Sequence, residues 1–250
     1  MEALLSGSTI FAQSKGINSL SGYASIIRWG FIGASLALLS ACGPNQVIVE
    51  GDFPTPLMSP LPLTIGVWYD EEFSTHEFFD EAKGRSDSSW VVKTGQAQTQ
   101  MWDIVLGGMF KELVHMKGAP SEGQLNQVVD AVLIPHVDEL QYAIPAHTNI
   151  KVYEIWMRYR IDMVTSSGEP IGSWTMTSYG KTPTAFLRSD KAAVNLAAVV
   201  ALRDAGANFI SNFSRVPEVR AWQERRSRPR PTTNDTVQSA LDATEQGAIE

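Results

Sequence analysis

The stretch from Tyr153 to Val164 reads Tyr-Glu-Ile-Trp-Met-Arg-Tyr-Arg-Ile-Asp-Met-Val and decides the fold class. Apolar and polar side chains alternate along it, which is typical of a strand with one buried and one solvated face. The predicted strand covers residues 150–164. Its buried face is Tyr153, Ile155, Met157, Tyr159, Ile161 and Met163, and its solvated face holds Glu154, Arg158, Arg160 and Asp162, with Trp156 among them.

Turn residues follow this strand at Ser166-Ser167-Gly168-Glu169. Glycine and serine at these positions favour a tight reversal of the chain. A second strand is predicted at residues 171–180, so residues 150–180 form an antiparallel hairpin.

Two further strands are predicted before the hairpin. Residues 63–69 alternate apolar side chains at every second position, and residues 129–143 are rich in apolar residues. Pro135 lies inside the second of these strands, which indicates a sheet edge or a bulge.

Two helices are predicted. The first begins near Thr94 and ends before Gly118 and Pro120. The second covers residues 190–213 and is capped by Ser189; its many alanines allow close approach to a sheet. The apolar face of the first helix is Met101, Ile104, Val105, Met109 and Leu113.

The order of elements predicts an α+β domain over residues 63–222, a small, mainly antiparallel sheet with two helices packed on one face. Residues 70–90 are acidic and polar, and we expect a long loop there. Its aromatic side chains Phe78 and Phe79 make this loop a candidate contact surface.

The only cysteine of the chain follows an uncharged apolar run at residues 29–41, preceded by Arg28. The run is shorter than the ~20 apolar residues of a spanning helix and has the length of a signal-peptide core. The residues before the cysteine, Leu39-Ser40-Ala41-Cys42, resemble the lipobox of bacterial lipoproteins. The alternative is a buried cysteine at the end of an ordinary helix.

The lipobox resemblance implies that residues 1–41 are a removed signal peptide and that Cys42 carries a diacylglycerol and a palmitate-type acyl chain. Two or more acyl chains anchor a protein stably. Gly43 rather than aspartate follows the cysteine, which by the same resemblance indicates an outer-membrane lipoprotein facing the periplasm. Residues 42–62 contain five prolines and are expected to be an extended tether. Residues 223–250 are polar and are expected to be a disordered tail.

The composition excludes some functions. The 250 residues carry a net charge of −7, so a nucleic-acid partner is not expected. One cysteine makes no internal disulfide, and four histidines argue against a rich metal site. We therefore expect neither a metal nor a cofactor.

The order of elements also resembles a group of envelope lipoprotein domains that includes CsgG, the N-terminal domain of TolB and the YajG-type lipoproteins. The resemblance covers residues 62–222. It rests on the hairpin Ser167-Gly168-Glu169-Pro170 and on Asn208-Phe209-Ile210 in the alanine-rich helix. It assigns no functional residue.

The candidate catalytic motifs are incomplete. His76-Glu77 lacks the second histidine of a zincin motif. His136 and Asp138 share one predicted strand face but have no placed nucleophile, so a hydrogen-bonded histidine is preferred. His115 near a helix C-terminus is explained by the helix dipole.

Two other motifs also have simple explanations. The pair Gly107-Gly108 lies inside a predicted helix and makes no phosphate loop. The arginines after residue 224 are either solvated or part of a docking segment. They are Arg225, Arg226, Arg228 and Arg230.

The solvated strand face is the stronger candidate surface. Trp156 lies between Arg158, Arg160 and Glu154, and an aromatic side chain among arginines is the composition of a binding hot spot. Cover by another element is the alternative.

The sequence therefore predicts a non-catalytic scaffold or assembly factor of a cell-envelope complex, acting in secretion, transport or a surface appendage. Its partners would be the membrane, other envelope proteins and, as a sub-case, further copies of itself. An auxiliary lipoprotein of an ABC-type transporter is the alternative, and a lipid-anchored cell-wall hydrolase is a third hypothesis.

Overall fold

The computed structural model describes residues 44–80, 89–120, 129–143, 152–182 and 189–228. The predicted signal peptide, Cys42 and most of the polar tail lie outside the described residues. The elements below all belong to one compact unit that begins at Asn45.

A five-stranded sheet forms the centre of this unit, in the order β5-β2-β6-β7-β8. β6, β7 and β8 pair antiparallel, while β2 runs parallel to both β5 and β6. The α+β class is confirmed, and the sheet is mixed. The strands are β2 (Leu61–Val67), β5 (Phe110–His115), β6 (Ala131–Ala143), β7 (Tyr153–Val164) and β8 (Pro170–Thr182).

The β7–β8 hairpin follows the predicted pattern. Its pairing runs without interruption from Tyr153 opposite Thr182 to Met163 opposite Gly172. All six apolar side chains of the predicted inner face of β7 are buried. Gly168 has a φ of 88°, a left-handed conformation that glycine adopts without steric cost and that closes this turn.

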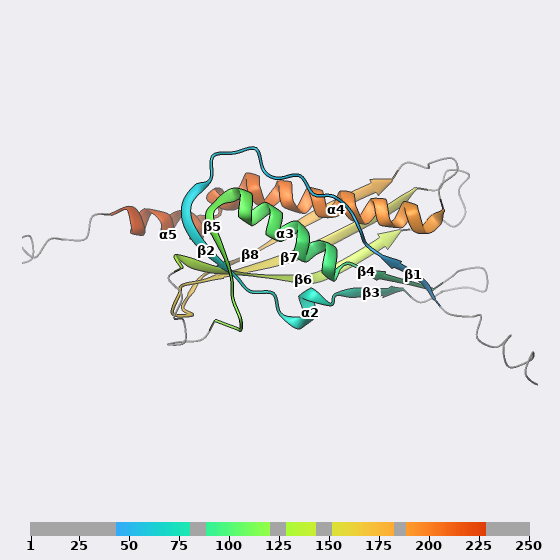
Figure 1. Ribbon diagram of the computed structural model, residues 1–250, viewed down its shortest axis with the longest axis horizontal. Helices are drawn as coiled ribbons and strands as arrows, with labels where there is room; N and C mark the ends of the chain where they lie inside the picture. The colour runs from blue at the N-terminus through green and yellow to red at the C-terminus, as the bar shows by residue number, and fades with distance from the viewer. Residues whose placement is uncertain (1–43, 81–88, 121–128, 144–151, 183–188, 229–250) are drawn as a thin grey trace, which may run out of the picture. The chain divides into compact units, whose positions relative to one another are not determined.

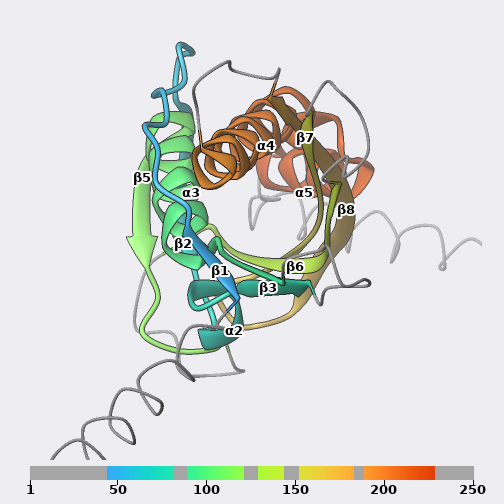
Figure 2. The same ribbon diagram turned by 90° about the vertical axis from the view of Figure 1, so that its right-hand side faces the viewer.

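Two helices, α3 (Gly95–Met109) and α4 (Asp190–Asn212), pack on one face of the sheet, as predicted. Figure 2 shows the sheet curving around them. Trp102 of α3 fills the core between them and the sheet, with ring centroids 4.9 Å from Phe209 and 5.8 Å from Tyr159. The Ser189 side chain caps α4, accepting a hydrogen bond from the Ala192 N–H at 3.2 Å.

Helix α4 approaches the sheet closely. A Cβ atom at Gly180 would lie 2.0 Å from the Ala197 carbonyl oxygen, so this helix lies directly on β8. The segment Asp190–Arg215 is long and apolar enough to cross a bilayer. In this fold its buried alanine side is instead the core face of α4.

The proline-rich segment is not a tether over residues 45–53. β1 (Asn45–Ile48) pairs in parallel with β4 (Trp90–Lys93), and Val47, Val49 and Phe53 are buried. The prediction was wrong here because four of the five prolines follow these residues and Pro44 precedes β1, leaving its backbone free to pair.

The predicted loop at 70–90 contains regular structure. α2 (Glu71–Ser74) is capped by the Asp70 side chain, and β3 (Glu77–Asp80) pairs antiparallel with β4. The order β1-β4-β3 makes a second, three-stranded sheet (Figure 1). Strands of four residues are too short to show a clear alternation of apolar and polar side chains, so the sequence did not predict them.

The first predicted helix is too long at its C-terminal end. α3 stops at Met109, and Phe110–His115 form β5, which includes Leu113. Pairing with β2 supplies backbone hydrogen bonds along one side of this segment, which overrides its helical periodicity.

The predicted tail begins too early. α5 (Pro217–Ser227) follows the short 3-10 helix Phe213–Arg215 and carries Pro217 at its first turn, a position that tolerates proline. Residues 223–227 are therefore helical. Residues 229–250 lie outside the described part of the chain.

Candidate functional site

The face of β6, β7 and β8 opposite the helices carries the side chains singled out from the sequence. We call it the outer sheet face. Trp156 of β7 and Tyr179 of β8 face each other across this surface, with 40% and 36% of their areas exposed and ring centroids 5.0 Å apart. The outer sheet face comprises Glu139, Gln141, Glu154, Trp156, Arg158, Arg160, Thr177, Tyr179 and Lys181.

Ion pairs frame the two rings. Arg158 lies 3.1 Å from Glu139, and Lys181 lies 3.3 Å from Glu154. The Tyr179 hydroxyl donates to Glu154 at 2.9 Å, and desolvation together with this bond raises the pKa of Tyr179. The rings and the ion pairs together form an amphipathic patch.

A hollow of about 260 Å³ lies beside Trp156 on this face. Glu139 and Gln141 of β6 and Arg158 of β7 are among its lining residues. An aromatic anchor beside a small hollow with charged walls suits the docking of another protein's side chain.

Arg160 does not share the surroundings of Trp156. Burial opposes its charge, but Asp162 and Asp138 outweigh that effect and raise the pKa of Arg160. Its Nε lies 3.3 Å from the Asp138 carboxylate, and its Nη1 pairs with Asp162. The Arg160 guanidinium is therefore already paired with carboxylates of the fold itself.

His136 has carboxylate partners, in keeping with the preferred expectation of a hydrogen-bonded histidine, but Asp138 is not one of them. A bulge between Val137 and Glu139 interrupts the strand at Asp138. His136 instead lies between Asp70, 3.5 Å from Nδ1, and Asp162, 3.2 Å from Nε2. This histidine ties the N-cap of α2 to β7.

Phe78 and Phe79 separate into two environments. Phe79 is 56% exposed and stays a candidate contact residue. Phe78 packs edge-on against Tyr142, with ring centroids 5.6 Å apart, and belongs to the margin of the core. Neighbouring residues of a strand point to opposite sides, so β3 can expose only one of them.

The two other histidines that the structure describes, His76 and His115, have structural partners. His76 Nδ1 lies 2.6 Å from Thr94 Oγ1, and burial lowers the pKa of His76. His115 lies on β5, not at a helix end, and its Nε2 lies 2.8 Å from Asp103. Within the described residues, no group of three or more His, Cys, Asp or Glu side chains could hold a metal ion.

Gly107 lies in α3, as expected, and a Cβ atom at this position would meet no other atom within 4 Å. The arginine cluster begins on α5, where Arg226 lies 2.6 Å from Asp130 and 5.2 Å from the Trp222 ring centroid. Arg230 and Cys42 lie outside the described residues.

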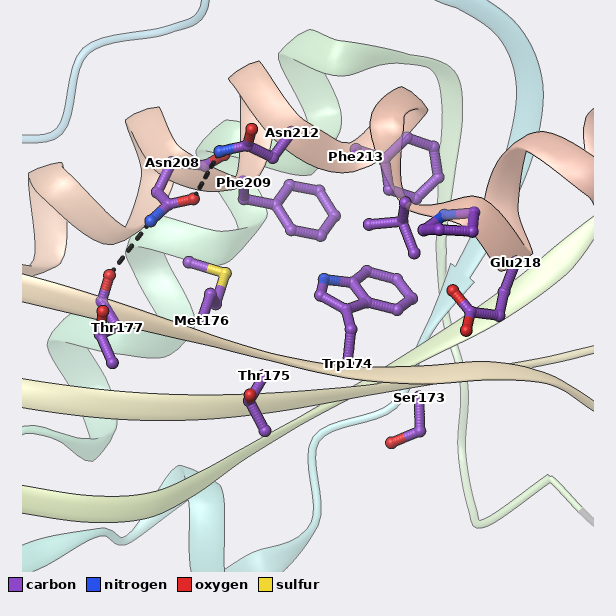
Figure 3. Close-up of a pocket in the computed structure, with 12 residues that line it drawn as sticks. Ser173, Trp174, Thr175, Met176, Thr177, Asn208, Phe209, Asn212, Phe213 and Glu218 are labelled. Carbon is purple, nitrogen blue, oxygen red and sulfur yellow. Dashed lines mark hydrogen bonds between the residues drawn. The ribbon is translucent and has the colours of Figure 1, made fainter.

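Sequence reasoning missed a groove of about 460 Å³ between β8 and the helical layer. Figure 3 shows Trp174 rising from β8 towards Phe209 and Phe213 of the helical layer, while Ser173 and Thr175 point to the other side of the sheet. Trp174 lies with its ring centroid 6.5 Å from Phe209 and 6.3 Å from Phe213. The alternation of side chains along residues 171–180 was the only feature of the sequence that could have placed Trp174 on the helical side of β8.

No family model matches the chain, and no curated relative matches it. Among solved structures, protein XCC0632 from Xanthomonas campestris matches with a TM-score of 0.43 and 14% identity, covering 74% of this chain and 99% of that chain.

Two lipoprotein structures also match. A minor lipoprotein from Acinetobacter baumannii has a TM-score of 0.38 and 9% identity over 63% of this chain and 94% of its own. Lipoprotein B from Nitrosomonas europaea has a TM-score of 0.35 and 12% identity over 67% and 94%. Likenesses this low carry no argument about the function of this chain.

Proposed function

We propose that the chain is a lipid-anchored protein of the bacterial outer membrane that faces the periplasm. The support is the apolar run at 29–41 that ends in Leu39-Ser40-Ala41-Cys42. A thiol directly after small residues is the nucleophile that such an anchor needs, and Gly43 agrees with an outer-membrane destination.

The folded unit of this lipoprotein is a non-catalytic docking module of a cell-envelope complex. The observation that carries this proposal is the exposed ring pair of Trp156 and Tyr179. Tryptophan, tyrosine and arginine are enriched in binding hot spots. Arg158 and Lys181, paired with Glu139 and Glu154, place charges of both signs around the two rings.

The histidines favour docking over hydrolysis. His76, His115 and His136 each face a hydroxyl or carboxylate of the fold itself. A hydrolase needs a nucleophile beside its base that a substrate can reach, and the one hydroxyl among these contacts, that of Thr94, is fully buried. The transporter alternative asks for a large apolar pocket. The groove at β8 has the largest volume of the hollows described above, and the polar residues Asn208, Asn212 and Glu218 are among those that line it, so it is not the large apolar pocket that this alternative needs.

The anchor is tested by replacing its nucleophile. Cys42→Ser should abolish incorporation of labelled palmitate and move the protein from the outer-membrane fraction to soluble or unprocessed fractions. Labelling that persists in this variant would show that the anchor proposal is wrong.

Docking is tested separately by mild crosslinking and affinity capture of the lipidated full chain. Trp156→Ala should reduce crosslinked partners from one envelope machine by about tenfold, the loss expected at a hot spot. Leu57→Ala is the matched control, because Leu57 is fully exposed and lies between β1 and β2. Equal capture by both variants would overturn the role of the outer sheet face.

A further inference from the structure

The outer edge of β8 is partly closed by side chains of α4. β8 is the last strand of its sheet, so one side of its backbone has no neighbouring strand. The Tyr179 N–H donates to the Asp204 carboxylate at 3.0 Å, and the Thr177 carbonyl accepts from Asn208 Nδ2 at 3.1 Å. These contacts take the place of a strand at that end.

The edge is open at Thr175. Backbone groups two residues apart in a strand point to the same side, and the β7–β8 pairing is regular through this region. The N–H and C=O groups of Thr175 therefore point the same way as the edge groups of Tyr179 and Thr177. Neither group of Thr175 has a hydrogen-bond partner among the described residues.

The opening is limited at one end by side chains of α4 on the edge itself, and at the other by α5, which covers the helical face of β8. Asn208 binds the Thr177 carbonyl and Asp204 binds the Tyr179 N–H, so the edge is covered beyond the Thr177 N–H. At the other end, α5 lies on Gly172, where a Cβ atom would be 2.5 Å from Glu218 Cβ. The open stretch, residues 173–177, is about 14 Å long at the usual rise of a strand.

The open edge borders the groove that contains Trp174 (Figure 3). Trp174 is the partly exposed aromatic side chain of the groove, and Phe209 and Phe213 lie buried behind it. Glu218 is the only charged residue among the twelve that line the groove, and it is exposed, with no ion-pair partner among the described residues.

From these features we propose that the groove binds an extended segment of a partner protein as an additional short strand beside residues 173–177. The segment's backbone bonds to Thr175. Its inward side chains are apolar over Trp174 and basic beside Glu218. This site is separate from the outer sheet face and does not depend on the lipid anchor.

The dimensions favour a single extended segment over a second copy of the chain. If two copies paired edge to edge, α4 and α5 of each copy would have to fit around an opening only five residues long. This leaves little room for a second folded unit. A basic charge on the occupant complements Glu218, whereas the folded unit's own β8 contributes no basic residue between 170 and 180.

The test uses the full chain in detergent and a five-residue peptide with blocked ends, Lys-Thr-Leu-Thr-Val. Lysine, leucine and valine of this peptide lie on one side when it is extended. We expect the peptide to bind at about 1 mM or below and to slow the hydrogen exchange of the Thr175 and Thr177 amides, measured by NMR. The same peptide with methyl groups on its leucine and threonine nitrogens, which removes the donor to Thr175 in either strand direction, should bind about tenfold more weakly.

Two variants of Thr175 separate backbone recognition from other effects. Thr175→Pro removes an edge N–H that makes no ladder bond, so the sheet tolerates it. Thr175→Val keeps the N–H and is the matched control. Peptide affinity should fall about tenfold in the proline variant and stay unchanged in the valine variant.

A third variant keeps the test valid if the proline variant does not fold. Glu218→Lys should reverse the charge preference, so that Glu-Thr-Leu-Thr-Val binds more tightly than the lysine peptide. Absence of binding at about 1 mM, or equal affinities in the two Thr175 variants, would overturn the proposal.

Two other occupants would also overturn it. If the Thr175 amide is protected in the free chain and becomes exposed after removal of residues 229–250, the chain's own C-terminal segment fills the groove. If Thr175→Pro converts a dimer into a monomer in sedimentation, the groove belongs to a second copy.

Discussion

The ring centroids of Trp156 and Tyr179 lie 5.0 Å apart on the outer sheet face, at directly paired positions of β7 and β8. Cross-strand aromatic pairs stabilise a sheet modestly and offer a large contact area. Since the helices cover the opposite face, this pair is available to a partner and not to the core.

We expect Trp156→Ala to lower the free energy of unfolding by about 1 kcal/mol, the value of one exposed aromatic pair. Trp102→Ala is the comparison, because Trp102 is 1% exposed and its loss should cost about 3–5 kcal/mol. Urea denaturation measures both. A loss at Trp156 as large as that at Trp102 would show a structural role instead of a docking role.

Gly180→Ala should destabilise the protein by about 3 kcal/mol, because the new methyl group would lie 2.0 Å from the Ala197 carbonyl oxygen and force α4 away from β8. Gly107→Ala is the matched control. Its Cβ meets no atom within 4 Å and lies inside α3, so it should stabilise by about 0.5–1 kcal/mol. Thermal unfolding distinguishes the two signs, and equal effects would contradict this packing.

Val47→Ala tests whether β1 belongs to the folded unit. Val47 is 4% exposed, and Ile48 beside it is 53% exposed. Loss of the buried methyl groups should cost about 2 kcal/mol, while Ile48→Ala should change stability by less than about 0.5 kcal/mol. If neither variant affects chemical denaturation, this segment is a tether after all.

His76 should make the stability of the protein fall in mild acid. Burial lowers its pKa in the folded state below the ordinary value of 6.5, so below that pH the unfolded chain binds a proton that the folded chain resists. The free energy of unfolding therefore decreases as the pH falls through this range, by at most ~1.4 kcal/mol per pH unit for one group.

The measurement compares the wild-type chain with His76→Asn by urea denaturation between pH 7.5 and 5, a range set by the reference value of about 6.5. The variant keeps a polar group near Thr94 but does not titrate. Its stability should depend less steeply on pH. An identical slope in both proteins would exclude His76 as the source.

The local pattern of residues was sufficient to predict the β7–β8 hairpin and helix α4. Six apolar side chains at every second position of β7 can be buried together only in an extended chain, and Gly168 supplies the turn. Ser189 and the alanine run likewise specify a capped helix that packs closely. The lipobox at Cys42 is also a local pattern and stays a prediction.

Local pattern failed where a neighbour far along the chain decides the conformation. Residues 110–115 continue a helical spacing, yet they form β5 because β2 offers backbone partners. β1 lies among prolines and is nevertheless a strand because it pairs in parallel with β4. In each case the competing hydrogen bonds come from residues that sequence spacing does not bring together.

The sequence by itself determined the alternation of β7, the alanine-rich helix and the presence of an aromatic residue among arginines. Only the tertiary structure decided that Tyr179 joins Trp156, that His136 turns to Asp70 and Asp162, and that the edge of β8 stays open at Thr175. Periodicity acts within one element, whereas these relationships depend on strand register and on which side chains of α4 reach the sheet edge.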